Sequence, residues 1–122
     1  MALDQETLDQ LIDTVQRFVK ERLIPNERAV EELNDIPPDI MQEMKDLGLF
    51  GLTIPEEFGG MGLGMEEEAK VVNEIGHAHG SFRSAFATTI GIGSQGIVID
   101  GTDEQKQTYL PRMAAGECIG SF

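Results

Sequence analysis

An uncharged run of 16 residues, from Ser84 to Ile99, is the feature that most restricts how this chain can fold. The chain otherwise carries 9 basic and 22 acidic residues, for a formal net charge of -13. The run contains several Ser, Thr and Gly residues and is shorter than the roughly 20 apolar residues that a membrane span requires. A helix without charges is typical of a buried position. We therefore expect a helix over 81–100, ended by Gly101, that the rest of the fold surrounds on all sides.

Apolar residues at three- and four-residue spacing predict further helices on both sides of this run. Asp4 is placed as an N-cap of the first helix, and Pro25 stops or bends that helix. Thr102 and Gln105 form a capping box at the start of the last one. The expected helices cover residues 5–23, 27–33, 38–47, 65–79, 81–100 and 102–115. No segment resembles an internal strand, so we predict an all-α fold, an antiparallel bundle of five or six helices.

Residues 49–64 interrupt this helical pattern with five glycines and one proline among Leu, Phe, Ile and Met. We call them the glycine-rich segment and interpret them as a long apolar loop. A loop of this composition is expected to pack against other parts of the protein. An alternative is that it forms a protein-binding patch on a free-standing helical interaction module.

Composition and charge exclude several classes of protein. With 40% hydrophobic and 25% charged residues, the chain has the composition of an ordinary globular domain. Its acidic surface repels phosphate backbones, so we expect no nucleic-acid partner. A single cysteine, Cys118, excludes an internal disulfide framework. No secretion signal or membrane-spanning segment is visible, and we expect a cytoplasmic protein without a membrane partner.

The residues themselves reveal no catalytic set and no metal site. His77 and His79 are two residues apart, so a helix would point them to different faces, and they fit the polar end of a helix better than a metal site. Cys118 has no neighbouring His or Lys that would activate its thiol. Residues 91–96 match the G-x-G-x-x-G dinucleotide motif, but they lack the strand–turn–helix context that the motif requires. We interpret these glycines as sites where a helix approaches a neighbour or a ligand closely.

Small residues along the uncharged run provide the best functional lead. They permit close approach either by another helix or by an acyl chain, and burial alone does not distinguish the two. Arg83 opens the run, where it can pair with a ligand carboxylate or with a neighbouring glutamate.

Two groups of motifs carry a resemblance to a known family. Residues 48–51 read GLFG and residues 54–60 read IPEEFGG, which resembles the helix-to-loop signature of the flavin-dependent acyl-CoA dehydrogenase family. Residues 101–106 read GTDEQK and residues 109–111 read YLP, which resembles its G-[ST]-x-E-Q-K-x-x-Y-L-P segment. The resemblance covers the whole chain and concerns the N-terminal helical domain of the family. It implies that residues 1–116 form this domain and that residues 117–122 begin the first strand of a β-domain that this chain lacks.

The resemblance also implies a larger enzyme of fatty acid metabolism, with a β-domain and a C-terminal four-helix bundle. FAD and an acyl-CoA substrate would lie between these parts, and a glutamate beyond Phe122 would remove the α-proton while the flavin accepts a hydride from the β-carbon. Phe122 matches the aromatic residue that opens a flavin-contact strand. The expected partners are an electron acceptor such as electron-transfer flavoprotein and further subunits of a homotetramer. The chain alone would be inactive, and flavin oxidase or monooxygenase chemistry on the same fold is an alternative.

The helix that matches residues 81–100 lines the distal end of the acyl cavity in this family. The expected substrate-binding residues are therefore Arg83, Ser84, Ala87 and Thr88. Residues 82–85 (FRSA) resemble the glutaryl-CoA dehydrogenase branch, in which an arginine at the position of Arg83 meets the distal carboxylate of the substrate. That branch has a serine at the position of Ala87, and Thr88 is an alternative source of a hydroxyl group.

Overall fold

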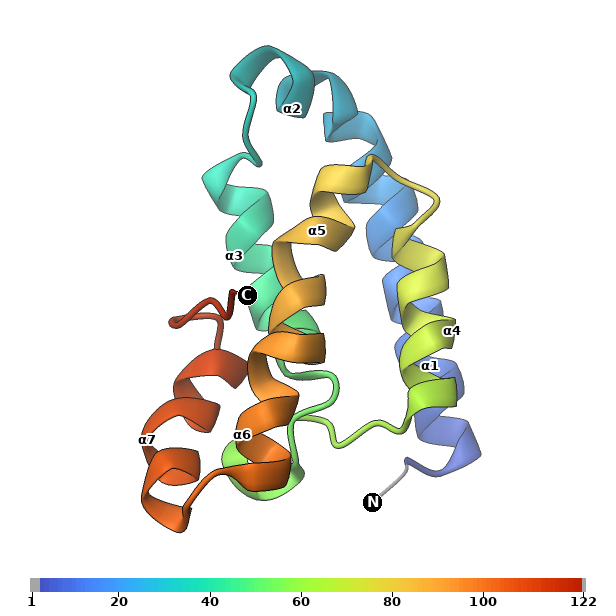
Figure 1. The fold of residues 1–122 in the computed structure, drawn as a ribbon. Coiled ribbons are helices and arrows are strands. Elements are labelled where there is room, and N and C mark those ends of the chain that lie inside the picture. The colour runs from blue at the N-terminus through green and yellow to red at the C-terminus, as the bar shows by residue number, and fades with distance from the viewer. Residues whose placement is uncertain (1–2, 122) are drawn as a thin grey trace.

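This computed structural model describes residues 3–121 of the chain, which contain seven α-helical segments (Figure 1). They are α1 (Gln5–Phe18), α2 (Glu27–Leu33), α3 (Pro38–Asp46), α4 (Met65–Ile75), α5 (Gly80–Thr88), α6 (Ser94–Asp100) and α7 (Asp103–Ala114). A π-helical turn, Thr89–Gly93, joins α5 to α6, so these two segments are the halves of one kinked helix and the described residues contain six helical units. The predicted all-α fold of five or six helices is confirmed.

The helix ends follow the capping chemistry expected from the sequence. Asp4 Oδ1 accepts a hydrogen bond from the Thr7 N–H at 2.8 Å, which caps α1. Thr102 Oγ1 accepts from the Gln105 N–H at 3.1 Å and Gln105 Oε1 accepts from the Thr102 N–H at 2.9 Å, the two bonds of a capping box on α7. Pro25 does not end the first helix abruptly. It lies in a 3₁₀ turn, Ile24–Asn26, that follows a π-helical turn, Val19–Leu23, and leads into α2.

Helices α1 and α4 lie side by side and run in the same direction (Figure 1). Two hydrogen bonds join their corresponding ends: Leu3 N–H donates to Glu67 Oε2 at 3.2 Å, and Gln16 Nε2 donates to Glu74 Oε1 at 3.1 Å. The parallel arrangement arises because α3 runs back toward the starting end of α1 and the glycine-rich segment then leads to the start of α4 (Figure 1). The kinked helix then runs antiparallel to both.

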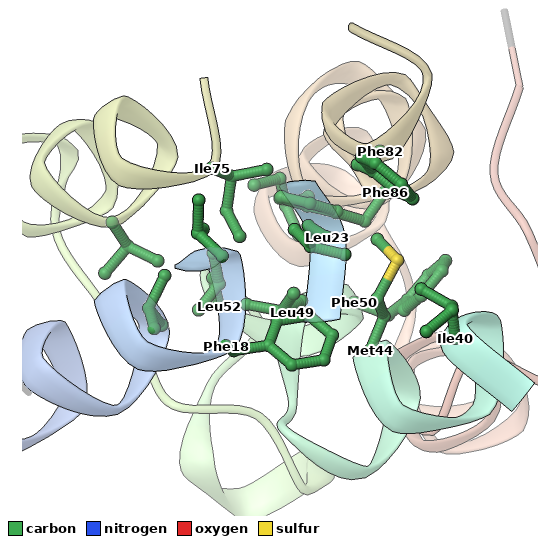
Figure 2. Close-up of a cluster of buried hydrophobic side chains, with 14 of the residues drawn as sticks. Phe18, Leu23, Ile40, Met44, Leu49, Phe50, Leu52, Ile75, Phe82 and Phe86 are labelled. Atoms are coloured by element: carbon green, nitrogen blue, oxygen red, sulfur yellow. The ribbon is translucent and has the colours of Figure 1, made fainter. Parts of the chain in front are cut away.

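The main hydrophobic core lies between α1, α3, α4, α5 and both ends of the glycine-rich segment (Figure 2). Phe50 and Phe86 meet there edge to face, with ring centroids 6.2 Å apart and an interplanar angle of 64°. A smaller cluster joins the rest of the glycine-rich segment to α7 through Ile54, Phe58 and Leu110. The interpretation of the glycine-rich segment as a protein-binding patch is therefore wrong, because its apolar side chains fill both cores of this chain.

The kinked helix departs from the sequence prediction in two ways. We expected one continuous helix over 81–100, but Gly91 has φ -95° and ψ -115°, which are not helical, and the helix kinks there. We also expected the helix to be buried on all sides, but Ser84, Thr88 and Ile92 are exposed in this chain. The reason is that one face, with Phe82, Phe86 and Ile90, is enough to complete the core.

Residues 117–121 form neither helix nor strand in this chain. The predicted boundary between residues 1–116 and a first strand at 117–122 stays a prediction, and Phe122 lies outside the described residues. Within residues 3–121, none of the helices is long and apolar enough to cross a membrane.

Candidate functional site

His79 sets the start of α5. Its Nδ1 accepts a hydrogen bond from the Ser81 N–H at 3.1 Å, and its Nε2 is hydrogen-bonded to Glu31 Oε1 on α2. Because Nδ1 is an acceptor, the ring proton lies on Nε2 and faces the glutamate. His79 is thus an N-cap. Among residues 3–121, no group of three or more His, Cys, Asp or Glu side chains is placed to hold a metal ion.

The four predicted substrate-binding residues share one side of α5, which we call the outer face. At 3.6 residues per turn, Arg83, Ala87, Ser84 and Thr88 cover an arc of roughly 140°. Arg83, Ser84 and Thr88 are exposed and Ala87 is half-buried, whereas Phe82 and Phe86 on the opposite side are fully buried. The fold therefore brings the four residues together and leaves them accessible.

Arg83 is the one charged residue on the outer face. No acidic oxygen of residues 3–121 lies within 4.0 Å of its guanidinium. The alternative in which Arg83 pairs with a neighbouring glutamate is therefore not what this chain forms. A guanidinium without such a partner keeps its donors available for a carboxylate, which it binds through two parallel hydrogen bonds.

A shallow pocket of about 320 Å³ lies beside the outer face. Ser81, Ser84 and Ala85 line it from α5, and Asn34, Asp35, Ile36 and Met41 line it from the turn after α2 and from α3. Asn34 has a positive φ of 53°, and Asp35 Oδ1 accepts from the Ile36 N–H at 2.8 Å, which gives this turn a defined shape. In this pocket, Ser84 thus lies beside the polar residues Asn34 and Asp35 and the small residue Ala85.

A second pocket, of about 390 Å³, lies on the other side of the kink between α4, the glycine-rich segment and α6. Its lining includes Glu68, Thr53 and Gln95. Burial raises the pKa of the Glu68 carboxyl above its ordinary value of 4.5. Gln95 Nε2 donates to the Thr53 carbonyl at 3.3 Å, which joins the kinked helix to the glycine-rich segment at this pocket.

The polar residues around the kink were not predicted from the sequence. Thr89 and Ser94 are fully buried, Thr89 Oγ1 accepts from the Gly120 N–H at 3.0 Å, and Thr53 Oγ1 donates to the Ile90 carbonyl. A signal was present, because two glycines two residues apart weaken a helix at that point. The partners of these groups were not visible, since they lie more than 30 residues away in the sequence.

The interpretation of the G-x-G-x-x-G glycines as sites of close approach to a neighbour holds for one of three positions, and close approach to a ligand stays a prediction. A Cβ on Gly93 would lie 3.0 Å from Gly120 Cα and 2.8 Å from the Thr88 carbonyl oxygen. A Cβ on Gly91 or Gly96 would have no neighbour within 4 Å in the chain.

Comparison with known proteins found a matching family model and similar sequences. A family model described as "Acyl-CoA dehydrogenase, N-terminal domain" matches residues 5–117. A relative from Bacillus subtilis (strain 168), named "Probable acyl-CoA dehydrogenase YngJ", is 36% identical over 90% of this chain and 29% of its own length. The mitochondrial isovaleryl-CoA dehydrogenase of Solanum tuberosum is 33% identical over 98% of this chain and 30% of its own length. The chain therefore spans less than a third of these relatives.

A solved structure gives the same picture in three dimensions. The structure of an acyl-CoA dehydrogenase complexed with FAD from Bacillus anthracis superposes with a TM-score of 0.80 at 31% identity. It covers 95% of this chain, and this chain covers 20% of it. Relatives named for very long-chain and (2S)-methylsuccinyl-CoA substrates match at 35% and 36% identity, so the identities do not single out one branch.

Proposed function

This chain belongs to the acyl-CoA dehydrogenase N-terminal domain family, and from that premise we propose that it is the helical domain of an FAD-dependent enzyme that desaturates acyl-CoA thioesters. The match over residues 5–117 carries the proposal. In it, residues 1–116 are the helical domain, and residues 117–122 begin the first strand of a β-domain. The full protein has a C-terminal four-helix bundle as well.

The outer face of α5 is proposed as one wall of the acyl pocket. Ser84, Ala87 and Thr88 are small, and an acyl chain can therefore approach the helix backbone closely. The chemistry that bound FAD supplies is acceptance of the hydride from the β-carbon of the thioester. From this chain, only Phe122 is proposed to contact the flavin. The carboxylate that removes the α-proton is proposed to lie outside this chain, so the chain alone is inactive.

The test is a comparison of the 122-residue chain with the full-length gene product. We expect the full-length protein to bind FAD tightly and to reduce an artificial electron acceptor when acyl-CoA is added, and the 122-residue chain to do neither. A stable flavin complex of the 122-residue chain would contradict the proposal. Equal electron transfer to dioxygen and to the artificial acceptor would instead favour oxidase or monooxygenase chemistry.

We further propose that Arg83 binds the distal carboxylate of a dicarboxylyl-CoA substrate, as in the glutaryl-CoA dehydrogenase branch. The free guanidinium on the outer face supports this proposal. Ala87 removes one hydroxyl that the branch uses, and Thr88 is the proposed replacement.

Replacing Arg83 with alanine in the full-length enzyme tests the role of this side chain. We expect kcat/KM for glutaryl-CoA to fall by about 10- to 150-fold, because a hydrogen bond to a charged group contributes about 1.5–3 kcal/mol. Activity on a monocarboxylic acyl-CoA of similar length should stay unchanged. Arg112→Ala, on α7, is the matched control. An equal loss on both substrates would mean that Arg83 is structural.

The remaining expectations concern the full-length protein. We propose that its electron acceptor is an electron-transfer flavoprotein, that it assembles as a homotetramer and that it acts in the cytoplasm. Light scattering of the purified full-length protein tests the tetramer, and acyl-CoA-dependent reduction of a purified electron-transfer flavoprotein tests the acceptor.

A further inference from the structure

At the kink between α5 and α6, a backbone carbonyl forms a hydrogen bond to another part of the chain. The backbone at Gly91 leaves the helical conformation, and the Ile90 carbonyl accepts a hydrogen bond from Thr53 Oγ1 in the glycine-rich segment. π-Helical turns inside helices are frequent at functional sites. Here the turn has a polar inner side, with the fully buried hydroxyl of Thr89 at its start.

The C-terminal segment, residues 117–121, returns to this turn after α7. The Gly120 N–H donates to Thr89 Oγ1 at 3.0 Å. The backbones of Gly93 and Gly120 are in contact: a Cβ on Gly120 would lie 2.9 Å from Gly93 Cα, and one on Gly93 would lie 3.0 Å from Gly120 Cα. Contacts between real Cβ atoms and other atoms almost never fall below 3.0 Å, so a side chain on Gly120 would force the two backbones apart.

A second attachment holds the start of the same segment. The N–H groups of Glu117 and Cys118 both donate to the Arg112 carbonyl, at 2.9 Å and 3.2 Å. Gly116, with φ 77°, makes the reversal that brings them there. The segment is therefore bound at two points, one on α7 and one on the kinked helix, and these two points define its direction.

We infer that Thr89 and Gly93 act as a clamp that fixes the C-terminal segment and thereby the starting position of the proposed flavin-contact strand. The inference rests on the proposed function, because the strand and the flavin contact of Phe122 belong to that proposal. Phe122 follows Gly120 by two residues in the sequence. Thr89 is a positioning residue in this account, since its buried hydroxyl holds Gly120 and is not available to a ligand.

The clamp itself is tested in the 122-residue chain by amide hydrogen exchange. Thr89→Val removes the hydroxyl and keeps the shape of the side chain. We expect the Gly120 amide to exchange about 2- to 12-fold faster, since one hydrogen bond is worth about 0.5–1.5 kcal/mol in net stability. Amides of α4 should keep their rates. Thr89→Ser keeps the hydroxyl and should protect Gly120, and Thr108→Val, on the exposed side of α7, is the control for the substitution type.

Gly120→Ala provides a second variant, in which the amino-acid sequence of the kinked helix is unchanged. Its side chain would meet Gly93 Cα and Met113 Cε, so the segment should move and residues 117–121 should exchange faster. Gly96→Ala is the matched control, because a Cβ there has no neighbour within 4 Å. Unchanged Gly120 exchange in both Thr89→Val and Gly120→Ala would overturn the clamp.

The consequence for the cofactor is tested in the full-length protein by titration of the apoprotein with FAD. Thr89→Val should weaken FAD binding by the same 2- to 12-fold, and Gly120→Ala should weaken it as well, whereas kcat at saturating FAD and the affinity in Thr89→Ser should match wild type. A wild-type protein that binds no FAD would overturn the proposed function together with this step, while the exchange experiment still decides the clamp. Wild-type FAD affinity in both variants, together with fast Gly120 exchange, would overturn the link to the cofactor alone.

Discussion

The glycine-rich segment and the kinked helix contact each other, yet they bury their side chains in opposite ways. In the glycine-rich segment, Leu49, Phe50 and Leu52 are fully inaccessible to solvent (Figure 2). In the kinked helix, Ile92 is 62% exposed. The glycine-rich segment, which contains two short 3₁₀ turns, Leu49–Gly51 and Glu56–Phe58, is therefore more deeply buried than the helix without charges. The difference follows from backbone geometry, because a helix turns every 3.6 residues and always presents a second face.

The glycine-rich segment is able to bury consecutive residues because its backbone groups find partners within the segment. The Gly51 carbonyl accepts from the N–H groups of Ile54 and Met61, and the Leu52 carbonyl accepts from the Leu63 N–H at 2.8 Å. Buried backbone groups without such partners would be costly. An irregular segment thus serves as core when its own hydrogen bonds replace those of a helix.

The largest effect that separates the two regions is expected for Phe50→Ala. Phe50 is fully buried between α3 and α5 and meets the Phe86 ring, so its loss leaves a cavity. We expect a loss of about 3–5 kcal/mol in the free energy of unfolding, measured by urea denaturation followed by circular dichroism. A loss below about 1 kcal/mol would mean that the segment is not core.

The next effect concerns the close backbone packing inside the glycine-rich segment. A Cβ on Gly60 would lie 2.0 Å from the Ile54 carbonyl oxygen and 2.6 Å from that of Gly51. Gly60→Ala should therefore cost about 1–3 kcal/mol through overpacking. Gly96→Ala in α6 meets no neighbour and should stabilise the chain by about 0.5–1 kcal/mol, as alanine usually does in a helix. Equal effects of the two substitutions would remove the distinction between the two regions.

A much smaller effect is expected on the exposed side of the kinked helix. Ile92→Ala removes a side chain that is mostly in solvent, so the free energy of unfolding should change by no more than about 0.5 kcal/mol. The same denaturation experiment measures it. A cost near that of Phe50→Ala would show that Ile92 is covered in solution, for example by a second copy of the chain, and a dependence of the cost on protein concentration would identify that case.

Local chemistry explains why much of the fold was predictable. The Asp4 cap and the Thr102–Gln105 capping box each depend on residues within one turn of each other. Helical spacing places the apolar residues of α1 and α3 on one side of each helix, and Val15, Ile40 and Met44 are fully buried there. The predicted end of α4 at His79 is wrong, because that side chain caps the next helix instead.

The candidate site was predictable only in part, for a reason that these same residues illustrate. The outer face of α5 follows from helical spacing, so Arg83, Ser84, Ala87 and Thr88 could be placed together. Gly91 and Gly93 marked a weak point of the helix, but the contacts that hold the kink could not be predicted, because Thr53 and Gly120 lie at distant positions in the sequence. The expectation that the kinked helix is buried on all sides was wrong. The absence of charged residues does not tell whether other residues of this chain pack against every side of the helix.

The smallest effect is expected where the two regions meet, at the pocket that contains Glu68. Burial raises the pKa of this carboxyl in the folded chain above its ordinary 4.5. The folded state therefore holds the proton more tightly than the unfolded state. The stability that this proton provides is fully present below pH 4.5 and is lost as the pH rises through the folded-state pKa. Glu68→Gln keeps the shape of the side chain and removes the charge.

Glu66→Gln is the matched control for Glu68→Gln, because both glutamates lie in the first turn of α4, where the helix dipole attracts negative charge. Glu66 also forms an exposed ion pair with Lys70 at 3.2 Å. The difference in free energy of unfolding between the two variants therefore reports the effect of burial together with the loss of that pair, which is worth no more than about 1 kcal/mol. We expect Glu68→Gln to gain relative to Glu66→Gln as the pH rises from 4 to 7, measured by urea denaturation at each pH. If the relative gain instead grows toward low pH, the folded state stabilises the ionised carboxylate of Glu68. That result would mean that water reaches the pocket between the glycine-rich segment and the kinked helix.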